Sequence, residues 1–294
     1  MKKEAFFYQA LDGNKVHCSL CAHGCTIADQ HYGICGVRKN EGGILFTYAY
    51  NNPIALNIDP IEKKPLYHFL PHTYTYSLAT FGCNFQCSFC QNWQISQTRE
   101  IDKLTEPKEV NPEQIVKNAL DSGCQSISYT YTEPTIFFEY AYDTAVFAHQ
   151  AGLKNIFVTN GYMSGIALKT IAPYLDAANV DLKSFSNEFY LKTCKAKLAP
   201  VLETIKAMHE LNIWVEITTL IIPGENDSQE ELAEIANFIA SVSKDIPWHI
   251  SRFHPDYKFL DHDYTAIETL KLAEDLGKQA GLKYVHLGNV PLGV

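Results

Sequence analysis

The sequence predicts an α/β protein, a partial (β/α)6 barrel preceded by an N-terminal, loop-rich module that contains cysteines. Three observations favour it. From about residue 76, short apolar segments rich in β-branched or aromatic residues alternate with segments that carry helix signals. Polar residues follow each of these apolar segments. Residues 1–75 lack this alternation and are rich in cysteine, glycine turns and proline. Alternating strands and helices imply right-handed crossovers and a parallel sheet, with an open doubly wound sheet as the alternative.

The chain is expected to divide into an N-terminal Cys-rich module, residues 1–75, and a barrel region, residues 76–294. The module shows no long helical period, so we expect only short strands there, one of them near Leu45–Tyr50. The apolar segments of the barrel region have the composition of buried parallel strands. The predicted strands are Tyr76–Phe81, Ser126–Tyr131, Asn155–Thr159, Ala178–Leu182, Ile213–Leu220 and Trp248–Phe253, with a weaker seventh at Lys283–Leu287.

Helix signals lie between these strands. A helix is expected near Thr135–Gln150, because Gly152 follows as a stop signal. Elsewhere an N-cap residue precedes a Glu or Gln at the third helical position, which is typical of helix starts. These pairs are Asn111 with Gln114, Ser228 with Glu231, and Thr265 with Glu268.

Composition and charge exclude several classes of protein. Of the 294 residues, 24 are Lys or Arg and 33 are Asp or Glu, so the formal charge is −9, and 46% are hydrophobic. This is a globular composition, and the acidic balance argues against a nucleic-acid partner. No apolar run approaches the ~20 residues that a membrane helix needs, so no membrane association is expected. The first residues do not resemble a secretory signal, and the sequence therefore predicts a cytoplasmic protein.

Three cysteines follow the first predicted barrel strand, with the spacing C-x3-C-x2-C. They are Cys83, Cys87 and Cys90. Three thiolates on one short loop can bind three irons of a 4Fe–4S cluster and leave the fourth iron open, whereas ordinary clusters of this type use four cysteines. The alternative is a structural zinc site with His68 or His72 as the fourth ligand, although zinc loops more often use two C-x2-C pairs.

Polar residues also follow the other predicted strands. In a parallel barrel, ligands bind at the carboxyl ends of the strands, so these side chains are expected to meet at one rim. Taken singly, each has a structural explanation, as a solvated carboxylate, a helix cap or a core histidine, but the repetition after every strand favours a binding site. The rim candidates are Glu133, Asn160, Asp181, Lys183 and His254.

The cysteine spacing, with Phe89 directly before the last cysteine, resembles the motif of the radical S-adenosylmethionine (radical SAM) superfamily. The resemblance implies a 4Fe–4S cluster on the three cysteines and S-adenosylmethionine (SAM) as cosubstrate. It also implies that Glu133 holds the methionine ammonium, since Tyr131-Thr132-Glu133-Pro134 matches a Gly-Gly-Glu-like segment. The glutamate is kept there, whereas Tyr131 and Thr132 replace small glycines.

Within the superfamily, the chain is similar to glycyl-radical activating enzymes such as the pyruvate formate-lyase activating enzyme. The matching strings are Thr159-Asn160-Gly161, Asp181-Leu182-Lys183 and His254. This resemblance implies that Lys183 meets the SAM carboxylate, that His254 lies on the ribose or adenine side, and that Asn92 reaches SAM. The full predicted set of cofactor-binding residues is Phe89, Asn92, Glu133, Asn160, Asp181, Lys183 and His254.

Longer strings resemble the radical SAM component of the AmmeMemoRadiSam system over nearly the whole chain. They include Cys18-x2-Cys21-Ala-His-Gly-Cys25, the segment Asp59–His68 and Cys90-Gln-Asn-Trp93. The resemblance implies Memo-like and AMMECR-like partner proteins, and an electron donor such as flavodoxin or ferredoxin.

A second cysteine cluster lies in the N-terminal module with spacing C-x2-C-x3-C-x9-C. Four thiolates at Cys18, Cys21, Cys25 and Cys35 can bind a tetrahedral zinc ion or a second Fe–S cluster. The alternative is that the thiols are reduced and carry no metal. Cys124 and Cys194 stand apart from both clusters and are predicted to be buried free thiols.

Three functions follow from these features. The first is a radical SAM enzyme that cleaves SAM reductively to a 5′-deoxyadenosyl radical, which abstracts hydrogen from an unidentified substrate. The second is an activating enzyme that places a glycyl radical on a partner protein. The third is a non-catalytic Fe–S or zinc-binding protein.

Overall fold

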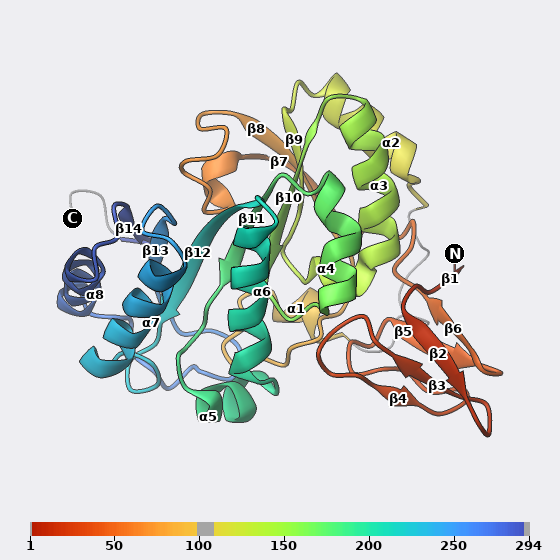
Figure 1. Cartoon of the computed structure of the whole chain (residues 1–294), viewed down its shortest axis with the longest axis horizontal. Coiled ribbons are helices and arrows are strands. Elements are labelled where there is room, and N and C mark those ends of the chain that lie inside the picture. Colours follow the sequence, from red (N-terminus) through yellow and green to blue (C-terminus); the bar gives the residue numbers. More distant parts are fainter. Residues whose placement is uncertain (1, 99–108, 291–294) are drawn as a thin grey trace.

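A computed structural model of the chain describes residues 2–98 and 109–290. Its centre is an eight-stranded sheet with the order β14-β13-β12-β11-β10-β9-β8-β7, in which β8 to β14 run parallel. The neighbours follow chain order without the reversal of a doubly wound sheet, so the partial barrel is confirmed (Figure 1). The strands are β7 (Ala55–Pro60), β8 (Tyr74–Ala79), β9 (Ser126–Tyr129), β10 (Lys154–Thr159), β11 (Ala177–Asp181), β12 (Trp214–Ile221), β13 (Trp248–Arg252) and β14 (Val285–Gly288).

Helices cover the outer face of this sheet (Figure 1). The predicted N-caps at Asn111 and Ser228 are confirmed, since their side chains accept hydrogen bonds from the backbone amides of Gln114 and Glu231. The helix predicted near Thr135–Gln150 begins as a 3-10 turn at Pro134–Phe137. The helices are α1 (Trp93–Ser96), α2 (Pro112–Asp121), α3 (Phe138–Gln150), α4 (Gly165–Ile171), α5 (Asn187–Phe189), α6 (Leu198–Glu210), α7 (Gln229–Val242) and α8 (Ile267–Gln279).

Two expectations about individual elements are wrong. β7, which pairs antiparallel with β8, precedes residue 76 and yet lies in the large sheet. It was not predicted because it is an edge strand with several exposed residues and a proline at its end. Thr265 does not cap α8. Its hydroxyl donates to the carbonyl of Ile221 and accepts from the amide of Phe253, so it ties the strand ends together instead.

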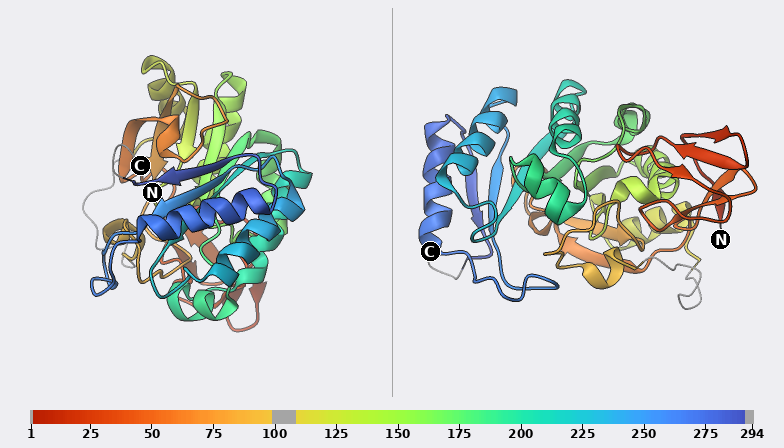
Figure 2. Two further views of the ribbon diagram at one scale, coloured as in Figure 1. Left: turned by 90° about the vertical axis from the view of Figure 1, so that its left-hand side faces the viewer. Right: turned by 90° about the horizontal axis from the view of Figure 1, so that it is seen from below.

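The N-terminal module consists of two three-stranded antiparallel sheets at one end of the molecule, with α8 at the other (Figures 1 and 2). A buried ion pair joins the module to the barrel, because the Arg38 guanidinium contacts the Glu139 carboxylate of α3. The predicted strand near Leu45–Tyr50 is present as β6. The module strands are β1 (Lys3–Glu4), β2 (Tyr8–Leu11), β3 (Lys15–Cys18), β4 (Thr26–Ile27), β5 (Arg38–Glu41) and β6 (Ile44–Thr47).

The segment between β7 and β8 closes the amino-terminal end of the barrel. Ile61 and Leu66 pack on Ile156 of β10 and Ala177 of β11 in a small apolar cluster. The backbone amides of Tyr67 and His68 donate to the Glu216 carboxylate of β12 at 3.0 and 2.9 Å. Residues 61–68 therefore form a floor, and the opposite end of the strands is left for ligands.

Candidate functional site

A cavity of about 320 Å³ lies at the carboxyl ends of the barrel strands. The loop after β8 contributes three cysteines to its wall, and the segments at the ends of β9, β10 and β11 contribute polar side chains. The prediction that one rim collects the residues that follow the strands is therefore confirmed for much of the set. The lining includes Cys83, Cys87, Phe89, Cys90, Asn92, Asn160, Asp181 and Lys183 among the predicted residues, together with Lys64, Thr130, Thr132, Thr218 and Ser251.

The three-cysteine loop brings its sulfurs to this cavity. The amide of Phe85 donates to Cys83 Sγ at 3.3 Å, and Ser96 Oγ lies 3.1 Å from Cys90 Sγ. Burial raises the pKa of the Cys83 thiol, and the Glu133 carboxylate raises it further. Ligation of a metal cluster would therefore have to supply the positive charge that keeps the Cys83 sulfur deprotonated.

Cys194 is a neighbour of this loop that the sequence spacing did not reveal. It is fully buried in the π-helix Tyr190–Cys194, and its thiol hydrogen-bonds to Cys87. That bond lowers the pKa of Cys87, and the nearby Lys183 ammonium lowers it further. The prediction of a buried free thiol is confirmed for both Cys194 and Cys124.

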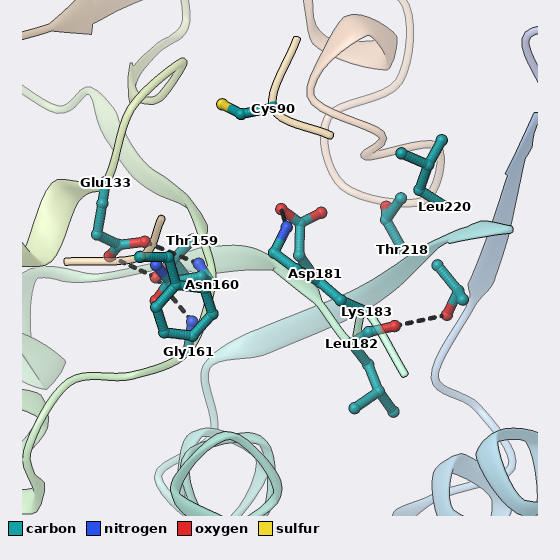
Figure 3. A network of polar contacts seen from close by, with 12 residues as sticks. Cys90, Glu133, Thr159, Asn160, Gly161, Asp181, Leu182, Lys183, Thr218 and Leu220 are labelled. Atoms are coloured by element: carbon teal, nitrogen blue, oxygen red, sulfur yellow. Dashed lines mark hydrogen bonds and ion pairs between the residues drawn. The ribbon is translucent and has the colours of Figure 1, made fainter. Parts of the chain in front are cut away.

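Asp181 and Lys183 form an ion pair at the end of β11, with 2.9 Å between Lys183 Nζ and Asp181 Oδ2 (Figure 3). Burial opposes the charge of Lys183, but Asp181 and the thiols of Cys87 and Cys194 hold its pKa well above the ordinary value. Asn226 accounts for the position of the lysine, because its Nδ2 donates to the Lys183 carbonyl at 2.6 Å. The cavity wall thus carries a half-buried ammonium that stays charged at neutral pH.

Glu133 does not line the cavity. Its side chain is fully buried and accepts from the amide and hydroxyl of Thr135, from Thr159 Oγ1 at 2.7 Å and from the amide of Asn160 at 2.8 Å (Figure 3). Burial raises its pKa, although these hydrogen bonds oppose the shift. In this structure the carboxylate ties the end of β9 to the end of β10, and the ammonium contact implied by the resemblance is not supported by its position.

Asn160 connects this network to the cysteine loop. Its Nδ2 donates to Asn84 Oδ1 at 2.7 Å and lies 3.8 Å from Cys83 Sγ. Asn84 is fully buried, and its own Nδ2 has no hydrogen-bond partner among the described residues. A buried donor without an acceptor, next to a cysteine and a cavity, fits a bound group that offers sulfide acceptors. The residues present therefore fit an Fe–S cluster at this loop.

The other predicted residues lie at the edge of the site. Asn92 lines the cavity and is exposed. Phe89 is buried, with the Lys183 ammonium 5.7 Å from its ring centre. His254 does not line the cavity. Its Nδ1 lies 3.3 Å from the Gln91 side chain, in the segment between Cys90 and α1.

The zinc alternative for the three-cysteine loop is wrong in its fourth ligand. His68 lies at the floor, where its Nε2 is 2.8 Å from His286 Nε2, and His72 is 94% exposed. Neither residue lines the cavity that contains the cysteines. Among residues 2–98 and 109–290, no three His, Cys, Asp or Glu side chains are already arranged to hold a metal ion.

The second cysteine cluster surrounds a separate, much smaller cavity of about 20 Å³. Cys18, Cys21, Cys25 and Cys35 all line it, and Arg38 Nη1 lies 3.5 Å from Cys18 Sγ. Burial raises the pKa of Cys21 to about 12, although the amide of His23 opposes the shift. The four thiols are free of disulfides.

Comparisons with known proteins identify relatives of this chain. The profile of the Radical SAM superfamily matches residues 77–239. An uncharacterized protein of Methanocaldococcus jannaschii is 48% identical over 290 residues, which cover 98% of this chain and 86% of that protein. A pyruvate formate-lyase-activating enzyme of Staphylococcus aureus is 22% identical over 236 residues, 74% of this chain and 91% of the enzyme.

Among solved structures, a radical SAM methyltransferase of Sphaerobacter thermophilus has the same fold. Its TM-score is 0.58 at 16% identity, and the match covers 76% of this chain and 68% of that structure. Within the described residues, none of the helices has both the length and the apolar character needed to cross a membrane.

Proposed function

The chain belongs to the radical SAM superfamily, and from this premise we propose that it cleaves SAM reductively and uses the product radical to abstract hydrogen from a substrate. Membership makes the chain an enzyme of radical chemistry, so the non-catalytic alternative is set aside. The observation that carries the proposal is the convergence of three cysteines and one charged lysine on a single cavity.

Cys83, Cys87 and Cys90 would hold a 4Fe–4S cluster, and the cavity wall beside them would hold SAM. When bound, the cluster supplies the electron that splits the sulfonium bond of SAM and yields a 5′-deoxyadenosyl radical. The protein contributes position and charge. Lys183 offers its ammonium to the SAM carboxylate in a charge-assisted pairing, since Asp181 and the neighbouring cysteines keep the lysine charged by holding its pKa above the ordinary value.

The neighbouring residues keep this arrangement rigid. Asn226 fixes the Lys183 backbone, and Glu133 fixes the backbone amide of Asn160. In this proposal Glu133 is a positioning residue for the rim and does not touch SAM. The floor at residues 61–68 closes the amino-terminal end of the barrel to water. This protects a reactive radical in the cavity from unwanted hydrogen donors.

The second candidate is an activating enzyme that acts on a partner protein. The relative named as a pyruvate formate-lyase-activating enzyme favours it, as do the large apolar side chains that are exposed near the rim. Leu260 is 71% exposed and Tyr264 is 58% exposed, in the segment between β13 and α8. Either activity needs a one-electron donor such as flavodoxin or ferredoxin. On the basis of the AmmeMemoRadiSam resemblance, we also propose Memo-like and AMMECR-like partner proteins.

The decisive experiment is anaerobic reconstitution with iron and sulfide, followed by a SAM-cleavage assay with dithionite. We expect 5′-deoxyadenosine from the wild type. Cys87→Ala should abolish cluster loading, whereas Cys124→Ala, which changes a cysteine outside both clusters, should load normally. A fully loaded wild type that forms no 5′-deoxyadenosine would contradict the proposed activity, and normal loading of Cys87→Ala would contradict the ligand assignment.

A further inference from the structure

We propose that Cys18, Cys21, Cys25 and Cys35 bind a single zinc ion, distinct from the Fe–S cluster, and that this ion fixes the N-terminal module against the three-cysteine loop. The inference does not depend on the proposed function. It rests on the geometry of the second cysteine cluster, on its cavity and on its contacts with the barrel.

The backbone around these cysteines is folded as thiolate sites usually are. The amide of His23 donates to the Cys21 sulfur, and the amides of Val37 and Arg38 donate to the Cys35 sulfur. The turn after Cys35 depends on Gly36, whose φ of 76° lies in the left-handed region that glycine favours. Backbone amides that donate to cysteine sulfur are typical of the surroundings of metal-binding cysteines.

A cationic side chain supports the same cluster. Arg38 is 1% exposed, and its guanidinium contacts both Cys18 Sγ and the Glu139 carboxylate. Arg38 Nε and Glu139 Oε2 have no hydrogen-bond partner among the described residues. A buried, incompletely satisfied cation beside four thiols fits a site whose occupied form carries excess negative charge, because four thiolates outweigh one divalent ion.

The size of the cavity favours an ion over a cluster. The four cysteines surround about 20 Å³, which is close to the volume that one water molecule occupies. The loop at Cys83–Cys90 borders about 320 Å³ in the same structure. The smaller space favours a single ion, which the four sulfurs can surround once the cysteine side chains rotate inward, over four irons and four sulfides. Binding transfers the four thiol protons to solvent.

A zinc ion at the second cysteine cluster would hold the three-cysteine loop in place. The amide of Ala22 donates at 3.0 Å to the carbonyl of Tyr162, the residue that follows Thr159–Gly161. His23 Nε2 lies 2.7 Å from the Asn84 carbonyl oxygen. A Cβ on Gly82 would lie 2.6 Å from the Cys35 carbonyl oxygen. The segments that carry Cys21 and Cys35 are therefore in contact with the start of the three-cysteine loop, at Gly82 and Asn84.

The test is a metal analysis of the full chain in which Cys83, Cys87 and Cys90 are all replaced by serine, so that only the second cluster can hold metal. We expect about one zinc per chain, without iron or acid-labile sulfide. A further Cys35→Ser substitution should remove the zinc, and a further Cys124→Ser should retain it. Iron with sulfide, absence of metal in the triple variant, or zinc kept in the Cys35→Ser form would each overturn the proposal.

A second measurement covers the case in which Cys35→Ser does not fold. The triple variant, stripped with a chelator under anaerobic conditions and titrated with Co²⁺, should develop the visible absorption of tetrahedral tetrathiolate cobalt and saturate at about one equivalent. Loss of that spectrum on addition of Zn²⁺ would support the assignment. A weak octahedral spectrum would overturn it. Neither readout requires SAM cleavage, so a failed activity assay and a failed zinc site remain distinguishable.

Discussion

Single residues determine how charge is distributed in the cavity. Lys183 is the charged lysine beside the three-cysteine loop, and its position depends on Asp181 at its ammonium and Asn226 at its carbonyl. Asp59 plays a comparable part on the β7 side, where it accepts hydrogen bonds from Lys64, Ser77 and Tyr131. Asp59 pairs with the buried Lys64 and Asp181 with the half-buried Lys183, and each pair leads to a separate prediction.

Substitution of Lys183 by Met is expected to raise the dissociation constant of SAM at least about tenfold, because hydrogen bonds to charged groups contribute about 1.5–3 kcal/mol. Equilibrium dialysis of cluster-loaded protein under anaerobic conditions measures it. Lys192→Met, which changes an exposed lysine of the π-helix Tyr190–Cys194, is the matched control. Equal SAM affinity in the two variants would remove Lys183 from the SAM site.

The lowered pKa of Asp59 leads us to expect that the stability of the protein depends on pH. Burial opposes its ionisation, but hydrogen bonds from Lys64, Tyr131 and Ser77 hold the pKa of Asp59 well below its ordinary value. A carboxyl whose folded pKa is depressed adds stability above its unfolded pKa and loses that contribution as the pH falls through the window down to the folded pKa. The difference in unfolding free energy between the wild type and Asp59→Asn should therefore be full above about pH 5 and shrink below about pH 4.

Urea denaturation across pH 3–7 measures this difference. Asp121→Asn serves as the control, since Asp121 pairs only with an exposed lysine on α2 and its side chain is 62% exposed. A pH-independent difference between the wild type and Asp59→Asn would show that the carboxylate is not preferentially ionised in the folded protein.

Tyr131 shows how this network tolerates a departure from the family pattern. The resemblance to radical SAM enzymes matches Tyr131 to a small glycine, and its φ of 62° lies in the left-handed region. Its hydroxyl hydrogen-bonds to Asp59, and the Lys64 ammonium lies 4.5 Å from its ring centre. These contacts offset a conformation that costs a residue with a Cβ about 1–2 kcal/mol.

At the scale of elements, the N-terminal module packs closely against the loop after β8. Gly82 precedes Cys83, has a φ of 89°, and faces the Cys35 carbonyl and Val37 at distances that leave no room for a Cβ. The loop can therefore reach its position only with glycine there.

Gly82→Ala is expected to lower the free energy of unfolding and to reduce cluster loading. Gly123→Ala is a matched control, because Gly123 also has a positive φ but has nothing within 4 Å of the added carbon. Both variants carry the backbone strain, and Gly82→Ala alone adds an overlap that should cost about 1–3 kcal/mol more. Denaturation curves and iron content measure the two effects. Equal losses in the two variants would contradict the close contact.

At the scale of the whole molecule, the buried pair of Arg38 in β5 and Glu139 in α3 joins the module to the barrel. Arg38→Met is expected to cost about 3–5 kcal/mol, because it leaves the Glu139 carboxylate uncompensated. The double variant Arg38→Met, Glu139→Gln should be more stable than the sum of the two single losses predicts. Lys117→Met, in an exposed ion pair of α2, should change stability little. Additive losses in the double-mutant cycle would refute a direct coupling of module and barrel through this pair.

The sequence predicts the parallel strands to within one or two residues at most ends, because buried strands are short continuous apolar runs with polar residues after them. It also predicts which cysteines share a loop. Contacts between distant residues leave no such local signal. The Cys87–Cys194 contact, the Arg38–Glu139 pair and the complete burial of Glu133 depend on packing between separate elements, and spacing along the chain does not encode them.

The floor formed by residues 61–68 determines from which end of the barrel SAM can enter and products can leave. Ile61, Leu66 and the Tyr67–Glu216 contact close the amino-terminal end of the barrel. The cavity is open to ligands at the opposite end of the strands. We therefore expect SAM to enter, and its cleavage products to leave, at the carboxyl ends of the strands.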